Sequence, residues 1–424
     1  MLRPDIFRNW LAAVLLMSLS LSWAQAQHGP HASPAAAAPT AQTPSPKPAS
    51  VKPKKMSLGT GAAFAPNGDL WITGLDAQGR LFVQSSTDLG QSWDAARLLD
   101  IGSDTVSADG ENRPKLAFFG PQNWVVISYT KPQSKPYTGD IRLLRSSDGG
   151  QTFAPPVTVH ADRQLITHRF DSIAFDAQGV LHTVWIDKRD LEASKTRKQP
   201  YRGAAIYRNE SNDGGASFGP DLKLADHTCE CCRIALSPTA EGGMAALWRH
   251  VFEPNQRDHA FARLQGEVPT VQRASQDQWA VDGCPHHGPG LALDEPRGGY
   301  HAVWFGLRAG DAAVRYGRLA PDGRPVGAVR ALPDPAAEHA DLAASGAKLA
   351  IVWRSFDGQA HRLRAWVSND GGQHFELKDL RSSPMDNDHP RLLLRRTGSG
   401  ADTRTEFYAL WRTAEKTHVI AIQP

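Results

Sequence analysis

"SSDGGQTF", at residues 146–153, has close copies at three other places in the chain. The copies are "STDLGQSW" at 86–93, "SNDGGASF" at 211–218 and "SNDGGQHF" at 368–375. All follow the pattern Ser-x-Asp-x-Gly-x-Thr/Ser-aromatic, except that His374 takes the seventh place in the last copy. The Asp can bond to the backbone of its own turn, and the Gly accepts a positive φ. The pattern therefore predicts four equivalent hairpin turns, each with an aromatic residue packed under its sheet.

A longer unit surrounds these turns and recurs along residues 57–424. It consists of a short apolar strand, a turn and a second strand that ends near an aromatic residue, as in "DSIAFDAQGVLHTVWID". The seven aromatic marks are Trp71, Tyr129, Trp185, Trp248, Trp304, Trp353 and Trp411. Repeats of paired short strands are typical of β-propellers. We therefore expect an all-β propeller of antiparallel blades, with seven blades favoured and six as the alternative, and with the tryptophans packed between blades.

The four turns and the repeat resemble the Asp-box (bacterial neuraminidase repeat) propellers of the sialidase-like superfamily. In that superfamily the box joins the third and fourth strands of a blade, on the face away from the active site. The resemblance therefore implies a structural role for the box aspartates, Asp88, Asp148, Asp213 and Asp370. Sialidases have six blades, so the count of seven favours a non-sialidase member.

The first 56 residues indicate export. Residues 1–26 combine Arg3 and Arg8 with a short apolar run and the small-x-small end Ala24-Gln25-Ala26, as in a secretory signal peptide cleaved near Ala26. Residues 27–56 are rich in Ala, Pro, Ser and Lys and predict a disordered tether, through which a protein partner could be held. We expect a periplasmic or secreted protein without a transmembrane segment or lipid anchor.

The charge of the propeller argues against a nucleic-acid partner. The whole chain carries +3, of which the signal peptide contributes +1 and the tether +4, so residues 57–424 carry −2. Proteins that bind nucleic acids present a basic face.

Propeller topology predicts a ligand site at one end of the channel. The innermost strands all run the same way, so the residues just before them surround one mouth, where propellers commonly bind ligands. The repeat itself does not require the polar residues found at these places. The predicted ligand-binding residues are Arg113, His168, Arg169, Asp171, Arg233, His339, Asp341, His389 and Arg391.

The cysteines lie at the same mouth. "HTCECCRIAL" (227–236) holds Cys229, Cys231 and Cys232, and "DGCPHHGPGLAL" (282–293) holds Cys284 beside His286 and His287. In an oxidising compartment four cysteines favour disulfides, with one bond from the triplet to Cys284 and a strained second bond inside the triplet. Thiolates with imidazoles would instead suit copper or zinc, and copper fits the irregular spacing better. A redox-active thiol pair is the third alternative.

The Cys-x-Cys-Cys and Gly-Cys-Pro segments also resemble those of an uncharacterised exported branch of sialidase-like proteins. That resemblance implies a shared site architecture and supplies no activity.

True sialidase activity would need three arginines around the substrate carboxylate, a tyrosine nucleophile with a glutamate, and an acidic catalyst. "NRPKLAF" (112–118) resembles the arginine motif of sialidases, so Arg113 is a candidate, with Arg233 and Arg391 as the other two and Asp171 as the acid. Glu111, Glu230 and Glu338 are candidates by position, and no tyrosine stands in a recognisable context.

Three functions follow. We expect a non-catalytic propeller that binds a small ligand or soft metal at its mouth, with copper favoured over zinc and no certain cofactor. A glycoside hydrolase of the exo-sialidase type that acts on acidic glycans is the alternative, and a scaffold for another exported protein is the third.

Overall fold

The computed structural model describes residues 57–108, 110–266, 269–283, 285–398 and 403–424. The predicted signal peptide and tether, residues 1–56, and Cys284 lie outside the described residues.

The described strands form seven antiparallel sheets, which confirms the prediction of seven blades. The first blade consists of β1 Gly61–Phe64, β2 Leu70–Leu75, β3 Leu81–Ser86 and β4 Arg97–Leu98, and the second of β5 Lys115–Phe119, β6 Trp124–Pro132, β7 Gly139–Ser146 and β8 Val157–Thr158. The third consists of β9 His168–Phe175, β10 Leu181–Asp187, β11 Ala204–Ser211 and β12 Leu222–Thr228, and the fourth of β13 Ala235–Pro238, β14 Met244–Arg249, β15 His259–Arg263 and β16 Gln272–Arg273. The last three are β17 Gly290–Asp294, β18 Gly299–Arg308, β19 Asp311–Leu319, β20 Pro325–Ala331; β21 Glu338–Ser345, β22 Lys348–Phe356, β23 His361–Ser368, β24 Glu376–Ser383; β25 Arg391–Thr397, β26 Arg404–Arg412, β27 Thr417–Ile422. One 3-10 turn, Gly120–Gln122, and one helix, α1 Arg189–Arg197, complete the described elements.

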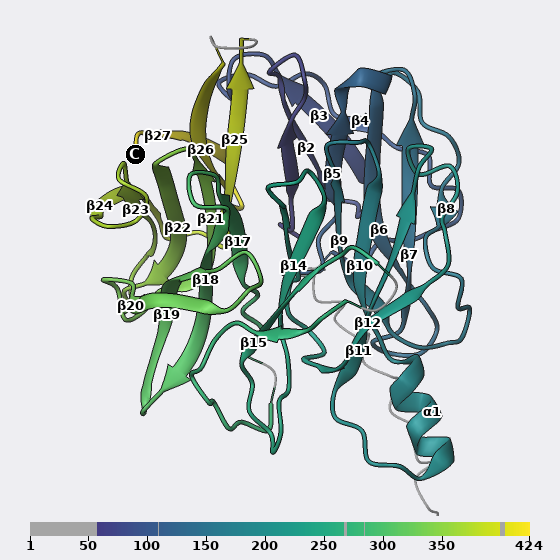
Figure 1. Ribbon diagram of the computed structural model, residues 1–424. Coiled ribbons are helices and arrows are strands. Elements are labelled where there is room, and N and C mark those ends of the chain that lie inside the picture. Colours follow the sequence, from purple (N-terminus) through teal and green to yellow (C-terminus); the bar gives the residue numbers. More distant parts are fainter. Residues whose placement is uncertain (1–56, 109, 267–268, 284, 399–402) are drawn as a thin grey trace, which may run out of the picture. The chain divides into compact units, whose positions relative to one another are not determined.

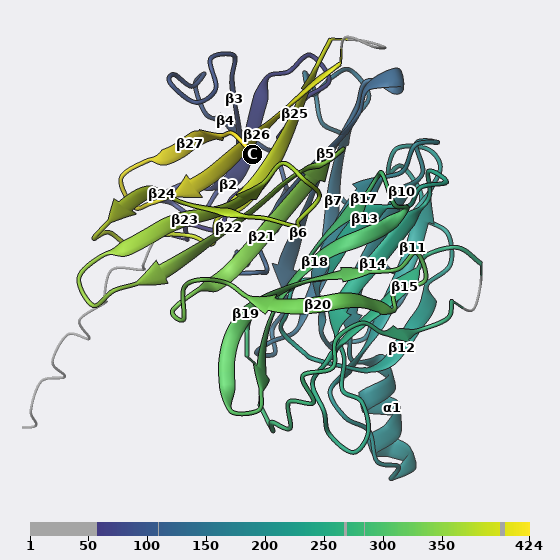
Figure 2. The same cartoon turned by 60° about the vertical axis from the view of Figure 1, so that its left-hand side comes forward.

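The blades follow one another in a closed ring. Each innermost strand contacts the innermost strand of the next blade, in the order β1, β5, β9, β13, β17, β21 and β25, and β25 contacts β1 again. Figures 1 and 2 show β25, β26 and β27 in yellow beside the purple strands of the first blade. The seven innermost strands therefore surround a central channel.

The topology gives the ring two different ends. Every innermost strand starts at one end, which we call the mouth, and the antiparallel second strand returns to it. Helix α1 follows β10 and therefore lies at the mouth, at the lower end in Figure 1. The Ser-x-Asp turns follow the third strands β3, β7, β11 and β23, so they lie at the opposite end, as expected.

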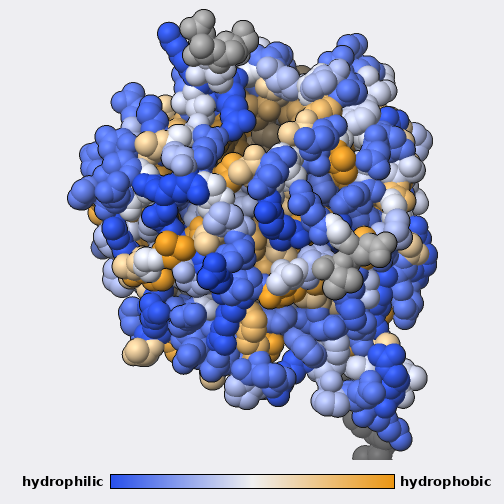
Figure 3. Space-filling model, viewed as in Figure 1, coloured by the Kyte–Doolittle hydropathy of each residue, from blue (hydrophilic) through white to orange (hydrophobic). Residues whose placement is uncertain are grey.

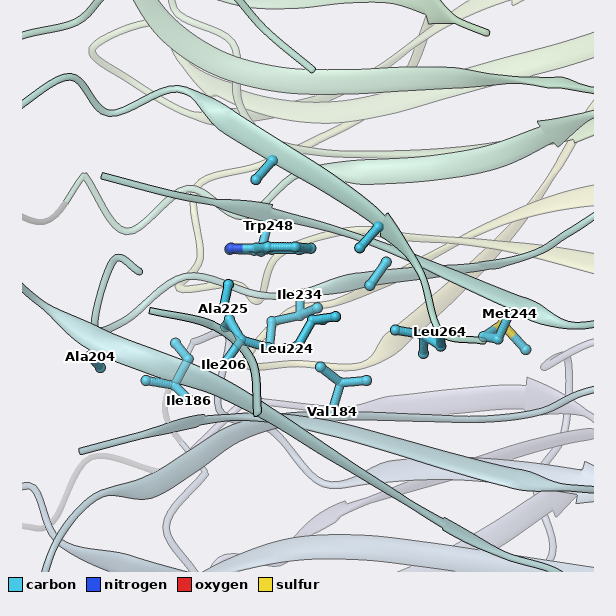
Figure 4. Close-up of a cluster of buried hydrophobic side chains, with 13 residues drawn as sticks. Val184, Ile186, Ala204, Ile206, Leu224, Ala225, Ile234, Met244, Trp248 and Leu264 are labelled. Atoms are coloured by element: carbon cyan, nitrogen blue, oxygen red, sulfur yellow. The ribbon is translucent and has the colours of Figure 1, made fainter. Parts of the chain in front are cut away.

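The second strands supply the core between blades. Tyr129, Trp185, Trp248, Trp304, Trp353 and Trp411 are all at most 3% exposed, as predicted. Figure 4 shows Trp248 of the fourth blade above Ile206 and Leu224 of the third, with Ile234 and Met244 beside them. Truncation of a buried Trp to Ala typically costs about 3–5 kcal/mol, so each of these residues is a large part of one blade interface.

Trp71 is the exception to the predicted pattern. It is the second residue of β2 rather than near its mouth end, and it is only partly buried. Its ring meets Phe118 edge-on at a centroid distance of 5.6 Å. A Cβ on Gly150, whose φ is 88°, would lie 2.8 Å from the same indole, so the turn of the second blade packs directly on Trp71.

The Ser-x-Asp turns are built as their sequence predicts. Ser146 Oγ donates to Asp148 Oδ1 at 2.6 Å and accepts from Gly150 N at 2.8 Å. Thr152 donates to Asp148 from its amide and its hydroxyl, at 3.0 and 2.6 Å. The same contacts recur at Asp213, and at Asp370 the ring of His374 takes the place of the hydroxyl, which indicates a structural role.

The outer surface is polar. In the view of Figure 3 hydrophilic residues prevail, and hydrophobic ones occur in small scattered groups. Among the described residues, no helix is long and apolar enough to span a membrane.

Candidate functional site

A cavity of 510 Å³ lies at the mouth of the channel. Its lining combines three imidazoles, of His286, His339 and His389, with two carboxylates, of Glu111 and Glu230. The cationic side chains Arg169 and Lys188 line it as well, together with Tyr137 and the thiol of Cys231. These residues come from the loops and the first strand residues of several blades, and the ring topology brings them together.

A second cavity of 280 Å³ lies in the channel, and Glu111 lines both. The charged residues around it form four ion pairs: Arg113–Asp388 at 2.7 Å, Lys115–Asp171 at 3.0 Å, Arg233–Glu111 at 3.2 Å and Arg391–Asp341 at 2.9 Å. Each pair joins two different blades. The positive and negative charges are equal in number, so the channel is neutralised by its own side chains.

This pairing bears on the predicted arginine clamp. The structure brings Arg113, Arg233 and Arg391 to one channel, but each guanidinium already binds a carboxylate of the same chain. Asp171, the candidate acid, accepts hydrogen bonds from Lys115 and from Ser128 Oγ at 2.6 Å. A substrate carboxylate would have to displace these partners.

Arg233 contacts other blades in addition to its ion pair with Glu111. Besides Glu111 of the second blade, it donates to the carbonyl oxygens of Gly288, Pro289 and Ala340. Burial alone would raise the pKa of Glu111, but the charge of Arg233 and hydrogen bonds from His339 and His389 hold that pKa well below its usual value. Glu111 is therefore an ionised carboxylate between channel and mouth.

Three imidazoles stack beside Glu111. The ring centroids of His287 and His339 are 4.3 Å apart, and those of His339 and His389 are 3.4 Å apart. The Nδ1 atoms of His339 and His389 lie 3.4 and 3.6 Å from Glu111 Oε1. Burial lowers the pKa of His389 well below its usual value and that of His287 to about 3, so both rings are neutral at pH 7.

Among the described residues, four groups of side chains have the ligand types and spacing to hold a metal ion. They are Cys229, Cys231 and Cys232; Glu111, His339 and His389; Asp140, His160 and His168; and His287, Glu338 and His339. In each group the potential ligand atoms lie within 4.8 Å of one another.

The third of these groups is already satisfied by protein contacts. His160 Nδ1 meets the Asp162 carbonyl at 2.6 Å, and its Nε2 accepts from the Ile141 amide at 3.2 Å. His168 is fully buried, with Nε2 3.1 Å from Asp162 Oδ1 and Nδ1 3.3 Å from the Gly139 carbonyl. His168, a predicted ligand-binding residue, therefore has both ring nitrogens in contact with Gly139 of the second blade and Asp162 of the segment that joins the second and third blades.

The cysteine triplet lies at the cavity wall. Cys229 and Cys232 are 0% and 3% exposed, and Cys231 lines the cavity. The sulfurs of Cys229 and Cys232 are 3.6 Å apart, well beyond the about 2.05 Å of a disulfide bond. The predicted bond from the triplet to Cys284 falls outside the described residues.

Tyr137 lines the cavity, and the sequence analysis did not predict it. It lies between the second and third strands of the second blade, in the segment "PQSKPYTGD" (132–140). Because second strands end at the mouth, the loops that follow them lie there too, and this rule could have identified Tyr137. Lys188 follows the second strand of the third blade in the same way.

Comparisons with known proteins support the fold. No protein-family model matches the chain, and no curated protein matches it. Among solved structures, a ulvan lyase of polysaccharide lyase family PL25, bound to -[GlcA(1-4)Rha3S]-, is similar with a TM-score of 0.53 and 12% identity, over 86% of this chain and 94% of that one. The α-L-arabinanase of Penicillium chrysogenum has a TM-score of 0.46 and 13% identity, over 87% and 93%.

The Hadza microbial sialidase Hz136 has a TM-score of 0.46 and 16% identity, and the match covers 71% of this chain and 63% of the sialidase. The chain thus spans less than two thirds of that sialidase. The match to the ulvan lyase, with a TM-score above 0.5 and 12% identity, supports a shared fold alone.

Proposed function

We propose that this protein is an exported, sialidase-like propeller that hydrolyses acidic glycans at the mouth cavity. The observation that carries the proposal is that two carboxylates, Glu111 and Glu230, and two cations, Arg169 and Lys188, line one cavity. Glycoside hydrolysis canonically uses two carboxyl groups on either side of the scissile bond. The similar ulvan lyase was solved with an acidic saccharide, which agrees with this substrate class.

The two carboxylates have different surroundings, as the two roles require. Glu111 is buried and ionised against Arg233, and it stabilises the positive charge that develops on the sugar ring in the transition state. Glu230 is partly exposed at the cavity wall, in an ion pair with Lys188. It is therefore the group placed to exchange a proton with the glycosidic oxygen or with water.

The cations give the cavity its preference for acids. Arg169 lies against the Phe170 ring, with its guanidinium carbon 5.2 Å from the ring centroid. Lys188 also lines the cavity, where it forms an ion pair with Glu230. A carboxylate or sulfate on the substrate gains charge-assisted hydrogen bonds from such groups. A neutral glycan gains none and is expected to bind less tightly.

The test is hydrolysis of a panel of uronate, sulfated and sialylated glycans, measured as new reducing ends and as release from a fluorogenic sialoside. We expect Glu230→Gln to lower kcat by about 10²–10⁴-fold, the usual contribution of a proton-transfer group. Glu241→Gln, in the exposed turn between β13 and β14, is the matched control and should keep full activity.

Two results would overturn this assignment. One is the absence of product from every glycan, and the other is full activity of the Glu230→Gln enzyme. Ultraviolet absorbance of an unsaturated product would instead identify a lyase.

A second candidate is the binding of a small ligand without turnover. The imidazoles of His286, His339 and His389 line the cavity, so they offer polar contacts to a ligand that enters the mouth. Equilibrium binding of a glycan with no product, lost in His389→Ala, would favour this candidate over hydrolysis.

Export belongs to the same proposal. Residues 1–26 are proposed to direct export and residues 27–56 to tether the propeller, with the propeller starting at residue 57. Amino-terminal sequencing of the protein recovered from the periplasm or medium tests this, and a start at Gln27 is the expected result.

A further inference from the structure

The cysteine triplet is a group of three thiols that the proposed hydrolysis does not use. The sulfurs of Cys229, Cys231 and Cys232 lie within 4.8 Å of one another, on four consecutive positions that precede β13. Spacing of this kind matches ligands around a single ion, since sulfurs bound to one metal at about 2.3 Å lie up to about 4 Å apart. The Cys229–Cys232 sulfur distance of 3.6 Å fits that range.

The loop is held in this form by its backbone. The Cys229 amide donates to the Arg249 carbonyl at 3.0 Å, and the Thr228 hydroxyl donates to the same oxygen at 2.9 Å. The bridge between Thr228 and His250 extends this pairing between blades three and four. The backbone at Cys229 is therefore fixed in position before any ion binds, which lowers the ordering cost of binding.

The triplet is open to the cavity through one of its thiols. Cys229 and Cys232 are 0% and 3% exposed, whereas Cys231 is partly exposed and lines the mouth cavity. An ion therefore has a route to the site.

We propose that Cys229, Cys231 and Cys232 together bind one copper(I) ion at the wall of the mouth cavity, independently of glycan hydrolysis. Thiolates are soft ligands and select copper(I). Structural zinc is almost always bound by four ligands in a tetrahedron, whereas this group has three sulfurs among the described residues. The ion enters as copper(I), so binding displaces thiol protons and requires no electron transfer.

The other candidate groups are less suited to a soft cation. Glu111 of the imidazole group is already paired with Arg233, whose positive charge would lie close to the ion. His160 has both ring nitrogens in hydrogen bonds to the backbone. The thiols are the group with soft ligands and direct access to the cavity.

The test is an anaerobic titration of the reduced protein with copper(I), in competition with a coloured copper(I) chelator. We expect one equivalent to bind, and Cys231→Ser to weaken binding by more than about 100-fold, beyond the 10–100-fold typical of outer-shell changes. Cys231 is the residue to change, because it is partly exposed and the variant is expected to fold. X-ray absorption of the complex should show sulfur neighbours.

His389→Ala is the matched control and should bind copper(I) as the wild type does, since it removes a ligand of the imidazole group at the same mouth. Loss of binding in His389→Ala with retention in Cys231→Ser would overturn the proposal in favour of the imidazoles. Peptide mass spectrometry of the exported protein that finds the three cysteines in disulfides would also overturn it.

Discussion

His182, at the start of β10, is buried between two carboxylates at the end of the ring opposite the mouth. Its Nε2 lies 3.0 Å from Asp176 Oδ2 and its Nδ1 lies 3.4 Å from Glu210 Oε1. Burial lowers the pKa of His182, but its hydrogen bonds with Glu210 and Asp176 outweigh burial, and the pKa is raised. The folded protein therefore binds a proton at His182 more tightly than the unfolded chain does.

The sign of the pH dependence follows from that shift. Stabilisation by charged His182 is fully present below the unfolded pKa of about 6.5 and is lost as pH rises through the higher folded pKa. We expect His182→Gln to lower the free energy of unfolding by about 1.5–3 kcal/mol near pH 6, the range for hydrogen bonds to charged groups, and by less near pH 9. Urea unfolding at both pH values measures this. Equal losses at both would contradict it.

Single residues show how far the sequence could predict the site. The alignment of innermost strands predicted Arg113, Asp171, Arg233 and Arg391 as ligand-binding residues at the mouth. In the structure Arg113, Arg233 and Arg391 line the channel cavity instead, and Asp171 is paired there with Lys115. The alignment could not predict their partners, because Asp388 and Glu111 approach them from blades that are distant in the chain. Whether a charged residue faces a ligand or a carboxylate of its own protein depends on those distances, which local patterns do not contain.

The Ser-x-Asp turns are the elements whose sequence is most directly tied to their structure. Asp213 accepts from Ser211 Oγ at 2.7 Å, from Ser217 N at 2.9 Å and from Ser217 Oγ at 2.6 Å. Burial would raise the pKa of Asp213, but hydrogen bonds from Ser217 and Ser211 lower it to about 2. The turn is thus stabilised by an ionised carboxylate.

We expect Asp213→Ala to destabilise the protein by about 1–2 kcal/mol at neutral pH, through the loss of these hydrogen bonds. The depressed pKa means that the difference is fully present above the unfolded pKa of about 3.9 and disappears as pH falls through about 2. Thermal unfolding of both proteins from pH 7 to acid pH measures it. Because the turn lies opposite the mouth, a folded Asp213→Ala protein that failed to bind glycan would contradict a structural role.

Elements that break the repeat were the ones that the sequence could not predict. Helix α1 interrupts the third blade after β10, where the repeat predicts a short loop. Its first turn holds Asp190 and Glu192 and its last turn Lys195 and Arg197, charges that suit the helix dipole. Such helix signals are weak beside seven repeated strand pairs. The burial of Trp71 could not be predicted either, because an aromatic residue marks a second strand wherever in the strand it lies.

Closure of the ring is a property of the whole propeller. The last blade has three described strands. The first and last blades meet through their innermost strands, β1 and β25, and through side-chain contacts. Asp388, before β25, accepts from Arg113 Nη1 of the second blade at 2.7 Å and from the Thr60 amide of the first at 3.0 Å. Arg412 of the last blade donates to Thr60 Oγ1 at 3.0 Å. One carboxylate therefore joins three blades at the point of closure.

Asp388→Asn should test whether this contact holds the ring together. Burial raises the pKa of Asp388 even beside Arg113, which indicates that the pair is enclosed by protein. Removal of one partner leaves the Arg113 charge buried, a change that typically costs about 3–5 kcal/mol. Asp322→Asn is the matched control, because it removes an exposed ion pair with Arg324 that is worth about 0–1 kcal/mol.

The double variant Arg113→Met, Asp388→Leu separates charge burial from closure itself. If the cost of Asp388→Asn is that of a stranded guanidinium, replacement of both charges by apolar groups should recover most of the lost stability in urea unfolding. If the hydrogen bond to Thr60 is what holds the first and last blades together, the double variant should stay as unstable as the single one and should unfold less cooperatively. We expect the first result, since β25 also contacts β1 directly and Arg395 of β25 donates to the Gly68 carbonyl of the first blade at 3.0 Å.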